Sequence, residues 1–236
     1  AIAGVHRADS AESIADACGT IILMLPDSRI VDALLWSDGL AARMKAGSLL
    51  IDMGSSDPNA TRANQSKLAS AGIALVDAPV SGGVRRAVDG SLAIMVGGAP
   101  ADVERALPLL QPMGKTIVPV GPPGAGHAVK ALNNYVSAAG LVAACEALVA
   151  AEKFGIDPSV ANKVFNASTG RNNTTDVKVE QFMLSGAFNS GFAAALMRKD
   201  LDTACSLMQS LGTERALMEA CAKMWQQAES TLPKGA

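Results

Sequence analysis

The 236-residue sequence has few aromatic residues and few cysteines, and neither sign of charge dominates it. Phenylalanine, tryptophan and tyrosine make up 3% of the residues, too few for the stacking platforms that bind single-stranded nucleic acids. The formal net charge is −2 and no long basic run occurs, so we expect neither nucleic acid nor an acidic membrane surface as a partner. No His, Cys and Asp cluster has the spacing of metal ligands, and we predict no metal.

The sequence also lacks an apolar run of 18 residues without a polar interruption, and its first 20 residues show no signal-peptide pattern. The four cysteines have no C-x-x-C spacing, as is usual in a reducing compartment. These absences predict a cytoplasmic protein that binds no membrane. The apolar content of 49% and the mean hydropathy of +0.24 indicate a well-buried globular chain of one large or two modest domains.

Up to Gly121 the sequence alternates short apolar strands with helices of about 12 residues, a pattern typical of βαβ units. After Gly121 only helical patterns occur. We therefore predict an α/β fold with a largely parallel sheet domain over residues 1–121 and an all-helical domain over residues 122–236. The expected strands are 20–26, 48–56, 74–83, 92–98 and 116–121. The expected helices are 9–18, 27–44, 58–71, 101–110, 124–155, 158–166, 177–184, 192–211 and 213–229.

The longest predicted helix, 124–155, contains no proline and only Gly140 as an internal breaker, and would be about 40 Å long. Apolar residues lie on all its sides, so we expect it to be buried on all sides. Its first turns carry one polar stripe, because positions i, i+3, i+4 and i+7 share a face. A buried lysine is rare without a partner or a task, so this stripe is the predicted catalytic centre. The stripe consists of Lys130, Asn133, Asn134 and Ser137.

The residues alone leave two interpretations of Lys130 open. A lysine desolvated beside amide groups can be tuned toward neutral pH and serve as a general acid/base. A lysine near the start of a helix can equally extend its ammonium group to solvent. His127, one turn earlier, is expected to cap or pack rather than to catalyse.

Three other polar segments also allow two interpretations. Ser81, Gly82 and Gly83 follow a strand and could bind a carboxylate through backbone N–H groups and a hydroxyl, but a plain turn explains the glycines equally well. The polar loop 171–175 could meet the substrate or simply be solvated, and we expect it to be solvated. Lys199 and Asp200 lie in an apolar helical pattern, where surface ion pairs between positions i and i+3 or i+4 are the plain account.

Four segments together resemble the β-hydroxyacid dehydrogenase family, which includes 3-hydroxyisobutyrate dehydrogenase and tartronate semialdehyde reductase. They occur in the family's order and spacing across nearly the whole chain. Phosphogluconate dehydrogenases are a poorer match, because their lysine is followed by His-Asn-Gly where this chain has Asn133-Asn134-Tyr135. The matching segments are MLP at 24–26, DAPVSGG at 77–83 with GSLAIMVGG at 90–98, GAGHAVKALNN at 124–134, and KDL at 199–201.

The resemblance implies that residues 1–121 are the remainder of a dinucleotide-binding, Rossmann-like domain. It also implies an oxidoreductase that transfers a hydride between NAD or NADP and a small 3-hydroxy acid or its semialdehyde. Lys130 resembles the family's general acid/base, and Asn134, with Asn133 beside it, resembles the asparagine that orients the substrate. Ser81, Gly82 and Gly83 resemble the loop that holds the substrate carboxylate. The residues that resemble cofactor contacts are Leu25, Pro26, Ser55 and Lys199.

The chain departs from the family pattern because it contains no GxGxxG turn. In dinucleotide-binding folds those glycines let the pyrophosphate reach a helix N-terminus. We therefore expect the sequence to be a piece of a longer protein. The alternative is a non-catalytic helical oligomerisation module that has lost its dinucleotide half. In either case we expect a homo-oligomer, a dimer or a tetramer.

Overall fold

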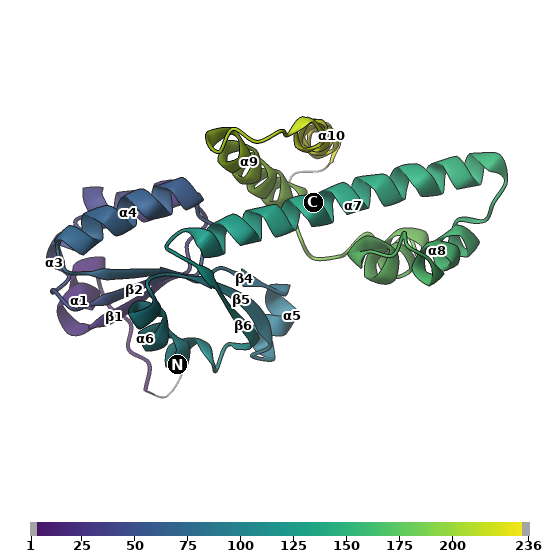
Figure 1. The fold of residues 1–236 in the computed structure, drawn as a ribbon. Helices are drawn as coiled ribbons and strands as arrows, with labels where there is room; N and C mark the ends of the chain where they lie inside the picture. The colour runs from purple at the N-terminus through teal and green to yellow at the C-terminus, as the bar shows by residue number, and fades with distance from the viewer. Residues whose placement is uncertain (1–3, 233–236) are drawn as a thin grey trace. The chain divides into compact units, whose positions relative to one another are not determined.

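The computed structural model describes residues 4–232 and forms two compact units, residues 1–130 and 131–236. The first unit contains the sheet and the second is helical (Figure 1), so the predicted fold class is confirmed. The domain boundary predicted after Gly121 stays a prediction. The two compact units divide later, after Lys130, inside helix α7 (Ala125–Phe154). The outer ends of both predicted domains, 1–3 and 233–236, lie outside the described residues.

The sheet has the order β1-β2-β3-β5-β4, with β6 paired to β5. Strands β1 to β3 are parallel to one another, and β5 and β6 are parallel, as predicted. β5 runs antiparallel to β3, however, because residues 78–91 form β4 and the short helix α5 (Gly83–Val88) instead of a helix that crosses the sheet. The strands are β1 (Thr20–Leu23), β2 (Leu49–Asp52), β3 (Ala74–Asp77), β4 (Val80–Ser81), β5 (Leu92–Gly97) and β6 (Gly114–Gly121).

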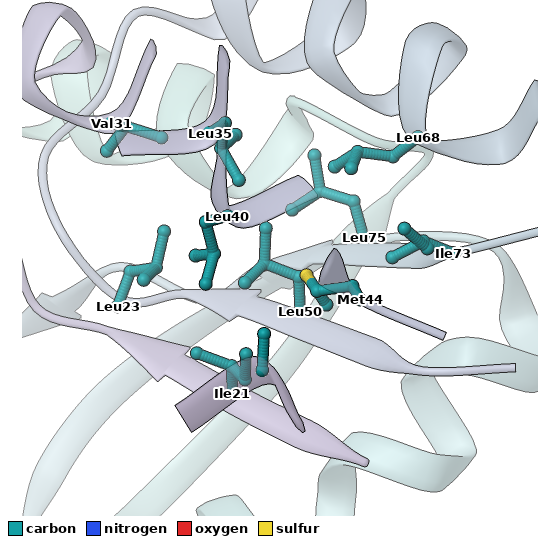
Figure 2. Close-up of a cluster of buried hydrophobic side chains, with 11 residues drawn as sticks. Ile21, Leu23, Val31, Leu35, Leu40, Met44, Leu50, Leu68, Ile73 and Leu75 are labelled. Carbon is teal, nitrogen blue, oxygen red and sulfur yellow. The ribbon is translucent and has the colours of Figure 1, made fainter. Parts of the chain in front are cut away.

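Both faces of the central strands β2 and β3 are covered. Successive side chains of a strand face opposite sides, so Leu50 packs in one buried cluster while Leu49 and Ile51 pack in another. Figure 2 shows the first cluster, in which Leu50 and Leu75 of the sheet meet apolar side chains of the covering helices. Burial on both faces explains why the strands appear in the sequence as continuous apolar runs. The helices of this unit, besides α5 and the start of α7, are α1 (Ala11–Ala17), α2 (Ser28–Asp32), η1 (Ala33–Ser37), α3 (Leu40–Arg43), α4 (Pro58–Ser70) and α6 (Pro100–Leu110).

The single helix predicted over residues 27–44 is wrong. Asp27 caps α2 through its Oδ1, and the helix continues as the π-helical turn η1. Gly39 then adopts φ 79°, a left-handed conformation that glycine tolerates without steric cost. The chain therefore changes direction at Gly39 before the short helix α3 begins.

The second unit packs helices around the continuation of α7. Ala131 and Ala138 of α7 pack with Leu201 and Met218, whereas Leu148 belongs to a separate cluster further along α7. The other helices of this unit are α8 (Pro158–Ala167), the π-helix η2 (Thr174–Leu184), α9 (Ala194–Ser210) and α10 (Ala216–Thr231).

The expectation that α7 is buried on all sides is wrong. Val136 is 69% exposed and Val149 is 50% exposed, because the packed helices leave part of the surface of α7 uncovered. Only 22% of its most apolar 18-residue window is buried. α7 is long and apolar enough to cross a bilayer. The core helix of a soluble protein can have the same length and composition, so these two properties are weak evidence for a membrane span.

Candidate active site

Lys130 lies in the second turn of α7 and is half-buried. Its Nζ donates a hydrogen bond of 2.7 Å to the carbonyl oxygen of Val80. Val80 directly precedes Ser81 in β4. The ammonium group is therefore held against the strand that leads into the predicted carboxylate loop.

The Ser81-Gly82-Gly83 loop has the backbone of a glycine turn. Gly82 has φ 135° and Gly83 has φ 65°, both in the region that favours glycine. A Cβ at Gly82 would also collide with the side chain of Arg86, which lies across the loop. Ser81 is half-buried and the two glycines are exposed. The turn explains the glycines, and carboxylate binding by this loop stays a prediction.

The loops that follow β1 and β2 approach each other closely. A Cβ at Gly54 would lie 2.5 Å from the carbonyl oxygen of Leu25, so only glycine fits there. Leu25 and Ser55 are half-buried and Pro26 is exposed. This edge lies beyond the carboxyl ends of two parallel strands, where open α/β sheets bind their ligands.

Sequence reasoning missed two buried aspartates at the same edge of the sheet. Asp52 and Asp77 end the neighbouring strands β2 and β3 and are paired in register. They are 3% and 0% exposed. Asp52 accepts hydrogen bonds from the Gly54 N–H at 2.9 Å and from the Ser56 hydroxyl at 2.7 Å. Asp52 thereby fixes the loop that contains Ser55.

The two carboxylate oxygens of Asp77 accept hydrogen bonds from two different backbone N–H groups at the start of α7. Its Oδ1 accepts from the Gly124 N–H at 2.7 Å, and its Oδ2 accepts from the His127 N–H at 2.9 Å. The first N–H groups of a helix have no partner within the helix, and a negative charge there is favoured by the helix dipole. Asp77 therefore caps α7 from the neighbouring strand.

His127 is buried and packed, as expected from the sequence. Its Nδ1 lies 2.8 Å from the Thr61 hydroxyl, with the tautomer deciding which group donates. Its Nε2 lies 3.8 Å from Asp52 Oδ2, and its Nδ1 lies 3.9 Å from Asp77 Oδ2. The imidazole ring thus lies between the two buried carboxylates, with neither contact short enough to be a hydrogen bond.

A second polar cluster lies in the helical unit. Asn134 is buried, and its Nδ2 donates to Asp200 Oδ2 at 2.5 Å. Lys199 Nζ lies 3.4 Å from Asp200 Oδ1. Asn133 is exposed, and its Nδ2 donates to Asn134 Oδ1 at 3.2 Å. The expectation of a surface ion pair is wrong for Asp200, which is 3% exposed and joins residues predicted separately for substrate and cofactor.

The expectation of a solvated loop at 171–175 is confirmed for Arg171 and Asn173, which are exposed, but is wrong for its last two residues. Thr174 and Thr175 are buried, and Asn172 Oδ1 accepts from the N–H of Thr174 at 2.8 Å. The carbonyl oxygen of Thr175 accepts a hydrogen bond from Asn162 at 3.1 Å. These polar residues start η2 and belong to the interior of the helical unit. Within residues 4–232, no group of three or more His, Cys, Asp or Glu side chains is placed to hold a metal ion.

Comparison with known proteins finds relatives for both parts of the chain. Residues 1–121 match the family model described as the NAD binding domain of 6-phosphogluconate dehydrogenase. Residues 124–236 match the family model described as NAD-binding of NADP-dependent 3-hydroxyisobutyrate dehydrogenase.

Individual relatives are similar over most of the chain. The 2-(hydroxymethyl)glutarate dehydrogenase of Eubacterium barkeri is 38% identical over 202 residues, which are 85% of this chain and 67% of the relative. The 3-hydroxyisobutyrate dehydrogenase of Pseudomonas aeruginosa is 36% identical over 215 residues, 88% of this chain and 72% of the relative. The structure of Mycobacterium tuberculosis 3-hydroxyisobutyrate dehydrogenase with L-serine has a TM-score of 0.87 and 31% identity, covering 94% of this chain and 78% of that one.

Proposed function

Because the chain belongs to the β-hydroxyacid dehydrogenase family of NAD(P)-dependent oxidoreductases, we propose that it transfers a hydride between NAD or NADP and a small 3-hydroxy acid or its semialdehyde. The observation that carries the proposal is the hydrogen bond from Lys130 to Val80, which holds an ammonium group beside the loop that begins at Ser81. These relatives make the alternative, a non-catalytic helical module, the less favoured one.

Lys130 serves as the general acid/base in this proposal. In the oxidation, its neutral amine accepts the proton of the substrate hydroxyl while the hydride leaves the carbon that carries this hydroxyl. In the reduction, its ammonium group gives the proton to the carbonyl oxygen. When bound, the nicotinamide supplies the hydride acceptor or donor. A lysine suits both directions because its ammonium donates and its amine accepts.

Two sets of residues position the substrate in this proposal. The loop of Ser81, Gly82 and Gly83 binds the carboxylate through its hydroxyl and backbone N–H groups. Asn134, one helical turn after Lys130 on α7, orients the hydroxyl, with Asn133 beside it. The hydrogen bond from Asn134 to Asp200 supports this role, because it fixes the orientation of the amide.

The proposed cofactor contacts come from the loops after β1 and β2 and from α9. Their place beyond the carboxyl ends of two parallel strands supports the first two loops, since open α/β sheets bind their ligands there. Lys199 is proposed from the family pattern, and its ion pair with Asp200 links it to Asn134. The proposed contacts are Leu25, Pro26, Ser55 and Lys199.

The exposed apolar side of α7 supports a homo-oligomer, a dimer or a tetramer. Leu132 and Val136, one turn apart on the same face of α7, are both exposed, and exposed apolar side chains that lie together are typical of a protein interface. The four cysteines are all free, which supports a location in the reducing cytoplasm.

The test is turnover of small 3-hydroxy acids with NAD and with NADP, followed by the absorbance of the reduced cofactor. Lys130→Met should lower kcat by about 10²–10⁴-fold, the usual contribution of a general acid/base. The matched control is Lys115→Met, which removes an exposed lysine from β6. Lys130→Met with the same kcat as Lys115→Met would refute the assignment. Absence of any nicotinamide cofactor binding would favour the helical module.

A further inference from the structure

We propose that Asp77 is the positioning residue for Lys130. Its carboxylate fixes the first turn of α7 on the carboxyl edge of the sheet, so that the ammonium group of Lys130 reaches the Val80 carbonyl. This inference rests on the proposed function, in which Lys130 exchanges the proton. Asp77 acts through the helix and touches neither the substrate nor the cofactor in this account.

The contacts join two short segments of the chain at successive points. Asp77 accepts hydrogen bonds from the N–H groups of Gly124 and His127. Three residues further along each segment, the carbonyl oxygen of Val80 accepts a hydrogen bond from Lys130. Both segments are rigid by themselves, because one leaves a central strand and the other is helical. Three hydrogen bonds between two rigid segments fix both the rotation of the first turns of α7 about the helix axis and their distance from the sheet.

Asp77 differs from the ordinary helix caps of this protein in using both of its oxygens. Asp57 and Asp157 each cap a helix differently, because Oδ1 accepts from both of the consecutive backbone N–H groups that are capped. Asparagine can replace such a cap, since its one amide oxygen does the same work. At Asp77, an asparagine would turn its NH₂ group toward one of the two N–H donors. The helix start would lose one of its two attachments and gain a repulsive contact.

The burial of Asp77 makes this loss hard to repair. The side chain is 0% exposed, so water has no open path to the abandoned N–H group. A buried donor without a partner is costly, and the helix start relieves it by moving. Lys130 lies one turn beyond His127 and moves with the helix.

The experiment compares Asp77→Asn with the matched control Asp157→Asn in the full chain. Asp77→Asn should lower kcat by about 10²-fold, the effect of misplacing a reacting group by about 1 Å, while KM changes by less than about threefold. Labelling of Lys130 by an amine-modifying reagent, read by peptide mass spectrometry, should become up to about tenfold faster as its hydrogen bond to Val80 is lost. Asp157→Asn should leave kcat, KM and Lys130 labelling unchanged.

The outcomes separate this inference from the proposed function. A lower melting temperature for Asp77→Asn with unchanged kcat and unchanged Lys130 labelling would reduce Asp77 to a structural cap and overturn the inference. If the wild-type chain turns over no hydroxy acid, the proposed function fails, and Lys130 labelling alone then decides whether Asp77 positions the lysine. If Asp77→Asn does not fold, hydrogen exchange of the wild-type chain decides: fast exchange of the Gly124 and His127 amides would contradict the two attachments, and slow exchange would support them.

Discussion

Gly126, in the first turn of α7, is the position where one methyl group tests how closely this helix approaches the sheet. A Cβ there would lie 2.5 Å from the carbonyl oxygen of Met95 and 2.8 Å from that of Asp77. Both oxygens belong to the backbone, so neither can turn aside as a flexible side chain would. Gly126→Ala therefore forces the first turn of α7 away from the strands that it touches.

The size of the effect follows from these distances. Ordinary van der Waals contact begins at 3.4 Å, so the helix start must withdraw by about 0.9 Å to clear Met95. Overpacking of this kind costs about 1–3 kcal/mol, and alanine in a helix recovers at most about 1 kcal/mol over glycine. We expect the free energy of unfolding to fall by up to about 2 kcal/mol. The shift also moves Lys130 relative to Val80, and a misplacement of about 1 Å lowers kcat by about 10²-fold.

Gly140→Ala is the matched control, because it makes the same substitution in the same helix. The nearest heavy atoms to a Cβ at Gly140 belong to Asn172, at 3.6 Å, which is an ordinary contact. Gly140→Ala should therefore raise the free energy of unfolding by about 0.5–1 kcal/mol and leave kcat unchanged. Urea denaturation and the hydroxy acid assay measure both quantities. Equal stability of the two variants would refute the close approach at Gly126, and an unchanged kcat in a destabilised Gly126→Ala would show that turnover does not depend on how the helix start is seated.

Three further changes test other parts of the molecule. Burial lowers the pKa of Lys178 from its ordinary value of 10.5, so the unfolded chain binds this proton more tightly than the folded chain. Lys178→Met should raise the melting temperature at neutral pH, and the gain should fade as the pH rises toward 10.5; a gain that does not depend on pH would contradict this. Asp200→Ala leaves the buried amide of Asn134 without its acceptor, and urea denaturation should show a loss of about 1–3 kcal/mol. Val136→Glu places a charge on the exposed side of α7, and light scattering should show a smaller oligomer; an unchanged mass would place the interface elsewhere.

Local patterns in the sequence predicted the elements that depend on local information. Strands β2 and β3 are continuous apolar runs because both of their faces are covered, and burial of this kind is visible in composition alone. The break in the helix over residues 27–44 was missed because one glycine, Gly39, decides it. The burial of Thr174 was missed because a polar loop looks solvated until its backbone partners are known.

The candidate site was predicted where single segments carry it and missed where distant segments meet. Lys130 and Ser81 each belong to a short recognisable run. The hydrogen bonds of Asp77 join residues 47 and 50 positions apart, and no periodicity reports such a contact. The exposure of Val136 was missed for a related reason: an apolar pattern shows that a face avoids water, but not which surface covers it.

The glycines at the carboxyl edge of the sheet and the charge of Asp77 depend on one another. A Cβ at Gly97 would lie 2.6 Å from Asp77 Oδ1 and 2.8 Å from the Gly126 nitrogen, so a side chain there would separate the carboxylate from the helix start. Without room, the helix cannot come close enough to donate to Asp77, and a carboxylate that is 0% exposed would lose its partners. Without the carboxylate, the close approach would leave the first N–H groups of α7 buried and unsatisfied. Residues 77, 97 and 126 therefore belong to a single contact. A double substitution within this contact should lower the free energy of unfolding by less than the sum of the two single substitutions.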